Sequence, residues 1–77
     1  MMIDFTNKEW DMIHCILELT EKAGFPPTVR EMQIALGYRS TSTVHHYIKR
    51  LAAVKAIRYE PAKPRTIVVL VPTKSRQ

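Results

Sequence analysis

Two helix-start signals of the same kind, separated by a strong stop, constrain the fold of this chain more than any other feature. The capping-box pattern Thr-x-x-Glu occurs at residues 6–9 and again at residues 28–31. In such a box, the threonine hydroxyl and the glutamate carboxylate satisfy backbone amides that the first helical turn leaves unpaired. Between the boxes, Gly24 favours the left-handed conformation that ends a helix, and the Pro26-Pro27 pair prevents any continuation. The chain must therefore form separate short helices rather than one long helix.

The spacing of apolar residues sets the extent of the two helices that follow these signals. The first is predicted at about residues 7–23, and Phe5 and Trp10 are placed to pack against each other across its start. The second is short, because it begins after Thr28 and Gly37 ends it.

A third helix is predicted at about residues 41–55, with Ser40 as its cap. Its apolar residues recur at helical spacing and form a buried stripe of Val44, Ile48 and Leu51. Only a few residues, one of them a glycine, separate this helix from the second. Two helices joined by such a turn are typical of the helix-turn-helix motif.

After the third helix the pattern changes from helical to extended. Residues 57–60 alternate in polarity, and residues 65–71 are rich in β-branched side chains. The connection between them contains two prolines, which cannot donate to a sheet ladder. These features predict a β-hairpin with a basic tip, which we call the wing. We therefore predict one domain at residues 1–72, mainly α-helical with a small β-hairpin, with a three-helix winged helix-turn-helix fold, followed by a flexible polar tail at residues 73–77.

Positive charge is concentrated in the second half of the chain. The 77 residues carry a net charge of +5. Residues 1–36 carry a net −3, whereas residues 37–77 carry a net +8. A segment with this much positive charge favours a polyanionic partner such as nucleic acid. The alternative interpretation of the charge is a solvated surface that only keeps the protein soluble.

Composition excludes several other classes of protein. No apolar run approaches the roughly 20 residues that a membrane span requires, and the single cysteine excludes an internal disulfide framework. A chain of this length also buries only a small hydrophobic core, which leaves little room for a catalytic pocket. We expect a cytoplasmic protein, nucleoid-associated when bound to DNA, with no membrane partner.

No residue pattern indicates catalysis, a metal or a cofactor. The adjacent pair His45-His46 is poorly spaced for a shared metal ion, because successive helical residues face different directions. Cys15 falls toward the polar side of the first helix, where Asp11 and Glu18 disfavour a thiolate, so we expect a partly buried structural side chain. We expect no enzyme activity, no cofactor and no small-molecule substrate.

The polar side of the third helix predicts a surface that reads double-stranded DNA. Its short polar side chains lie near the helix start, where they can approach base edges in the major groove, and its cations lie a turn later, where they can reach phosphates. Arg39, just before the helix, can contact a guanine or a phosphate, and Lys63 and Arg65 in the wing can contact the DNA backbone. The side chains on the helix itself are Ser42, Thr43, His45, His46, Lys49 and Arg50.

Two other interpretations remain open from the residues alone. The polar side of the third helix is compatible with an ordinary solvated helix face. The chain is also compatible with a winged-helix module that binds protein, for example one that modulates a host repressor or RNA polymerase through an acidic surface of that partner.

Four segments of the chain carry a family resemblance: residues 25–31 (FPPTVRE), 36–40 (LGYRS), 42–45 (STVH) and 63–65 (KPR). In order and spacing they resemble the N-terminal DNA-binding domain of the LexA repressor family, and the last two are most similar to versions from Gram-positive bacteria. The resemblance covers about residues 5–71. It implies a repressor of the SOS response that binds an inverted-repeat operator as a dimer. By position, it implies base contacts from Ser40, Ser42, Thr43, His45 and His46, and phosphate contacts from Thr28, Arg30, Arg39 and Lys49.

One departure from the family limits what the resemblance implies. LexA repressors continue into a self-cleaving domain with a serine–lysine dyad, which also supplies most of their dimer interface, whereas this sequence ends at Gln77. We therefore expect either a DNA-binding domain excised from a longer repressor or a free-standing regulator of prophage type. Release of DNA by self-cleavage does not follow for this polypeptide.

Overall fold

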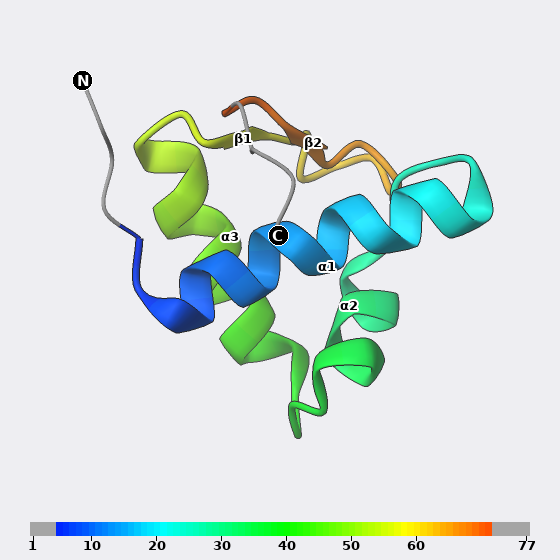
Figure 1. Cartoon of the computed structure of the whole chain (residues 1–77), viewed down its shortest axis with the longest axis horizontal. Helices are drawn as coiled ribbons and strands as arrows, with labels where there is room; N and C mark the ends of the chain where they lie inside the picture. The colour runs from blue at the N-terminus through cyan, green and yellow to red at the C-terminus, as the bar shows by residue number, and fades with distance from the viewer. Residues whose placement is uncertain (1–4, 72–77) are drawn as a thin grey trace, which may run out of the picture.

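A computed structural model describes residues 5–71 as three helices followed by a two-stranded hairpin. The helices are α1 (Asn7–Ala23), α2 (Val29–Leu36) and α3 (Thr41–Ala53), and the strands are β1 (Ile57–Arg58) and β2 (Val68–Val69). Figure 1 shows α1 crossing over α2 and α3, with the hairpin along one side of the helices. The strands are antiparallel, with Ile57 opposite Val69 and Arg58 opposite Val68. The architecture is the predicted winged helix-turn-helix, and the predicted tail at 73–77 lies outside the described residues.

Both predicted capping boxes are present. The backbone amide of Glu9 donates to Thr6 Oγ1 at 3.2 Å, and Glu9 Oε1 in turn accepts the amide of Thr6 at 2.9 Å. Thr28 and Glu31 repeat this exchange at 3.1 and 3.0 Å. Because these local bonds fix where each helix starts, α1 and α2 begin where the sequence predicts.

Packing of aromatic rings at the start of α1 also follows the prediction. The rings of Phe5 and Trp10 meet edge-to-face with centroids 4.9 Å apart, which fixes the angle at which the chain enters the helix. Trp10 also stacks on the imidazole of His14, with ring centroids 5.6 Å apart.

The third helix ends two residues earlier than predicted. Its last helical residue is Ala53, and Lys55 adopts a left-handed backbone with φ 63°. The amide of Ala56 donates to the carbonyl of Leu51 at 2.8 Å, and that of Lys55 to the carbonyl of Ala52 at 3.0 Å. This pair of bonds is a Schellman motif, whose left-handed position usually holds glycine. The turn it makes brings the chain back over the core, so Ala56 and Ile57 are buried.

The hairpin is less regular than predicted, because side chains replace part of its ladder. The amide of Glu60 donates to the hydroxyl of Thr66 at 2.9 Å, and that hydroxyl also contacts the carbonyl of Lys63 at 3.1 Å. Arg65 has a left-handed backbone, with φ 60°, and so interrupts the predicted extended stretch 65–71. Regular pairing is therefore confined to two residues on each strand.

The core lies between the three helices and the hairpin. The predicted stripe on α3 is fully buried, and residues from every element pack around it. The buried apolar residues are Met12, Ile13, Cys15, Ile16, Met32, Val44, Ile48, Leu51, Ala56, Ile57 and Ile67. Burial of one side of α3 leaves its opposite side facing outward. In the described part of the chain, no helix is both long and apolar enough to cross a membrane.

Replacing Lys55 by glycine is expected to stabilise the domain. A side chain in the left-handed region costs about 1–2 kcal/mol, and glycine removes this strain. Glycine also makes the unfolded chain more flexible, which offsets part of the benefit, so we expect the free energy of unfolding to rise by roughly 0.5–1 kcal/mol. Urea unfolding followed by circular dichroism measures the change. Gly37→Ala is the matched control. Gly37 has φ 76° and open space around it, so an alanine there meets only backbone strain and should lower the free energy of unfolding by about 1 kcal/mol. An unchanged or lower stability for Lys55→Gly would contradict this account of the turn.

Candidate nucleic-acid interface

The outward side of α3 carries the predicted base-reading residues. All six of its proposed DNA contacts are exposed: Ser42, Thr43, His45, His46, Lys49 and Arg50. Arg39 and Ser40, which precede the helix, are exposed as well. Ser40 has the extended backbone of a helix cap, but its side chain makes no capping hydrogen bond. Its hydroxyl is therefore not engaged in holding the start of α3.

A groove of about 550 Å³ runs between α3 and the wing. One wall consists of Thr41, His45 and Lys49, which are spaced one helical turn apart on α3. The start of α2 and residues 59–67 of the wing form the rest of the lining. The groove brings together half of the predicted contacts: Thr28, Arg30, His45, Lys49, Lys63 and Arg65. The other half lie outside it: Arg39, Ser40, Ser42, Thr43, His46 and Arg50.

Three exposed cations surround this groove from three different elements. Arg30 is on the first turn of α2, Lys49 is on α3, and Lys63 is at the tip of the wing, where its ammonium lies 4.0 Å from the carboxylate of Glu60. Elements far apart in sequence thus combine into one electropositive concavity, which suits a polyanion.

Arg50 differs from these cations because a buried carboxylate holds it. Its Nε and one terminal nitrogen both lie 3.1 Å from Glu9 Oε2. Glu9 is 6% exposed, and the backbone hydrogen bond from Thr6 together with the nearby guanidinium lowers the pKa of its carboxyl group. The pair joins the start of α1 to the middle of α3 across 41 positions in sequence. Helical spacing alone placed Arg50 correctly on the outer side of α3 but could not reveal this partner.

Arg65 is also held by a carboxylate, that of Glu31 at the start of α2, at 2.8 Å. Both arginines were predicted as DNA contacts, and in the structure each is paired with a carboxylate of the protein itself.

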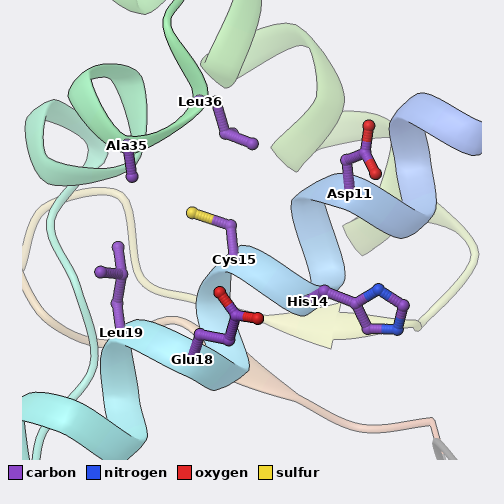
Figure 2. A pocket seen from close by; sticks show the side chains of 7 residues that line it. All are labelled: Asp11, His14, Cys15, Glu18, Leu19, Ala35 and Leu36. Carbon is purple, nitrogen blue, oxygen red and sulfur yellow. The ribbon is translucent and has the colours of Figure 1, made fainter. Parts of the chain in front are cut away.

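A smaller hollow of about 380 Å³ lies between α1 and α2. Figure 2 shows the sulfur of Cys15 turned toward Ala35 and Leu36, whereas the imidazole of His14 points away from it. Sequence spacing placed Cys15 toward the polar side of α1 and partly buried, but α2 covers that side and leaves the residue only 7% exposed. Burial, with a contribution from the charge of Glu18, raises the pKa of the Cys15 thiol to about 11. The thiol is therefore protonated at neutral pH and poorly nucleophilic.

Among residues 5–71, no group of three or more His, Cys, Asp or Glu side chains is placed to hold a metal ion.

Comparison with known sequences agrees with this geometry. The family profile described as the LexA DNA binding domain matches residues 2–66, which is most of the chain. The chain belongs to the LexA DNA-binding domain family. The match runs from α1 to the end of the wing tip, and it includes every residue predicted above to contact DNA.

Three relatives with similar sequences are named LexA repressors. The chain is 47% identical to the one from Clostridium tetani over 64 residues, which cover 83% of this chain and 32% of the relative. It is 42% identical to the one from Clostridioides difficile over 74 residues, which cover 96% of this chain and 35% of the relative. It is 36% identical to the one from Ruminiclostridium cellulolyticum over 72 residues, which cover 94% of this chain and 34% of the relative. This LexA-family chain thus spans about a third of the length of its relatives.

Replacing Glu9 by glutamine tests the Glu9–Arg50 pair through pH. Glutamine retains the capping box but not the ion pair, so we expect a loss of about 1 kcal/mol at pH 7. Because the pKa of Glu9 is lowered in the folded protein, its contribution is present above the unfolded pKa of about 4.3 and is lost as pH falls through the folded value. Unfolding free energies of wild type and Glu9→Gln should therefore begin to converge as pH falls below about 4.3 and meet only below the folded pKa of Glu9. A gap that stays constant into strong acid would contradict the pair.

Proposed function

We propose that this chain is a sequence-specific, double-stranded-DNA-binding transcription regulator that acts as a repressor. The observation that carries the proposal is the two-sided character of α3. One side buries Val44, Ile48 and Leu51, and the other presents polar side chains beside a cationic groove. The family match to a DNA-binding domain supports the same conclusion.

In this proposal α3 enters the major groove with its N-terminal end. Ser42, Thr43 and His46 have short or planar polar side chains, so the helix can approach base edges closely enough for hydrogen bonds. The exposed amides at the start of α3 and the side chain of Arg39 contact the adjoining backbone.

The groove between α3 and the wing receives one strand of the DNA backbone. Lys49 lies on the wall of the groove and Lys63 at its edge, while Thr28 and Arg30 come from the start of α2. Cations on three sides neutralise successive phosphates and fix the register of the helix on the duplex.

Two copies on an inverted repeat are needed for useful affinity. A single module of this size buries only roughly 600–1,000 Å² of protein surface on DNA. We propose half-sites about 10 bp apart, or a multiple of that spacing, each occupied by one copy.

The protein-binding alternative is not favoured, because the family match is to a DNA-binding domain. A salt titration against random-sequence duplex DNA separates the two. We expect micromolar binding that weakens steeply as salt rises. No association with DNA at any salt concentration would favour the alternative.

Removing the charge of Lys49 should weaken binding to every DNA sequence alike. A lost phosphate contact lowers the slope of log K against log salt by about 0.9. Fluorescence anisotropy at several salt concentrations measures this slope for Lys49→Ala. Lys8→Ala, which removes an exposed lysine on α1, is the control and should leave the slope unchanged. An unchanged slope for Lys49→Ala would contradict the phosphate contact.

Removing a base contact should change sequence preference instead. We expect Ser42→Ala and His46→Ala to lose roughly 1–3 kcal/mol of discrimination at particular base pairs. Sequences selected from a random DNA pool by each variant and by wild type provide the measurement. Identical selected sequences for all three proteins would contradict base reading by these residues.

A further inference from the structure

Arg65 reaches from the wing to the start of α2 and makes several contacts there. One of its terminal nitrogens donates to Glu31 Oε1 at 3.0 Å, and the other donates to Glu31 Oε2 at 2.8 Å. The first also donates to the carbonyl of Pro26 at 3.0 Å. The guanidinium carbon lies 4.6 Å from the centroid of the Phe25 ring. These contacts form a clamp, which we define as Arg65 with Glu31, Pro26 and Phe25.

The geometry of the clamp suits arginine and not lysine. A guanidinium presents parallel N–H groups that match the two oxygens of a carboxylate, and its plane can stack on an aromatic ring. A lysine ammonium retains the charge but offers neither property. Arg65 also has a left-handed backbone, with φ 60°, and such a conformation persists only where surrounding contacts hold it.

The base of the wing is fixed in the core by Ile57 and Ile67, but every residue of its tip, 60–65, is exposed. Each strand has only two paired residues, and the tip is closed by local contacts of Thr66 and by a 3.0 Å bond from the amide of Lys63 to the carbonyl of Glu60. A hairpin of this size is marginally stable alone. The clamp adds a tie between the tip of the wing and the start of α2.

A phosphate contact by Arg65 would conflict with these bonds. Its guanidinium is already paired with a carboxylate, so transfer to a phosphate would leave the charge of Glu31 uncompensated beside DNA. Glu31 stays ionised, because hydrogen bonds from Arg65 and from the amide of Thr28 lower the pKa of its carboxyl group. At the tip of the wing Lys63 is the more available cation, because its side chain is 72% exposed and its ammonium has only a 4.0 Å contact with the exposed carboxylate of Glu60.

We propose that Arg65 is a positioning residue, which sets the wing so that Lys63 meets the DNA backbone, and that it is not itself a phosphate ligand. This inference rests on the proposed DNA-binding function. It replaces the expectation that Lys63 and Arg65 contact DNA in the same way.

A double-mutant cycle on random-sequence duplex DNA distinguishes positioning from direct contact. Lys63→Ala should lower the salt slope by about 0.9. If Arg65 acts through Lys63, adding Arg65→Ala to Lys63→Ala lowers the slope no further. If Arg65 binds its own phosphate, the double variant loses about 1.8 in slope, and the proposal is overturned.

The conservative substitution gives a second criterion. Arg65→Lys retains the charge but not the bidentate pairing. We expect it to bind DNA as weakly as Arg65→Ala, whereas wild-type affinity would overturn the proposal. Unfolding in urea checks that each variant remains folded at the concentrations used.

Amide exchange in the free protein tests the clamp without any DNA. We expect wing amides such as that of Lys63 to exchange roughly fivefold faster in Arg65→Ala and in Glu31→Gln, which retains its capping box. The control Glu21→Gln removes an exposed carboxylate on α1 and should change nothing. Unchanged exchange in the first two variants would overturn the clamp. If the wild type failed to bind DNA, the proposed function would fail, but this experiment would still decide whether the clamp holds the wing.

Discussion

Burial of one side of α3 is the constraint on which the rest of the structure depends. Val44 and Ile48 are completely inaccessible to solvent, and Leu51 is 1% exposed. Truncation of a buried side chain of this kind typically costs about 2–5 kcal/mol, a large part of the total stability of a small domain. Because these residues fix the rotation of α3 about its own axis, they also decide which side chains face outward. The core therefore determines the candidate DNA-binding surface.

Each of the two capping boxes has two structural roles. In each box the glutamate satisfies a backbone amide at the start of its own helix, and its carboxylate also receives an arginine from a distant segment. Glu9 receives Arg50 from α3, and Glu31 receives Arg65 from the wing. The same local signal that starts each helix thus also anchors one of the two elements proposed to meet DNA.

Local signals in the sequence predicted most of the fold. Capping boxes, glycine stops and apolar spacing depend on residues within a few positions of each other, so the bounds of α1 and α2 and the buried stripe of α3 followed from them. The predicted end of α3 was wrong by two residues, because a lysine in the sequence does not indicate the left-handed conformation that Lys55 adopts there. Cys15 is more buried than its place on α1 indicated, because only the packing of α2 decides how much of that side is covered.

Contacts between distant residues could not be predicted in this way. The carboxylates that hold Arg50 and Arg65 lie 41 and 34 positions away, and no spacing rule connects them. In the sequence, all the basic residues of the second half therefore looked equally available to DNA. Only the three-dimensional arrangement separates the arginines paired with buried or capping carboxylates from exposed cations such as Lys49.

The central claim is that the outward side of α3 binds double-stranded DNA. Nuclear magnetic resonance tests it most directly, by titrating the labelled protein with a duplex of about 20 bp and following each backbone amide. We expect the largest shifts at residues 39–49, with smaller ones at the wing and the start of α2. Shifts gathered on the exposed side of α1, with residues 39–49 unchanged, would contradict it.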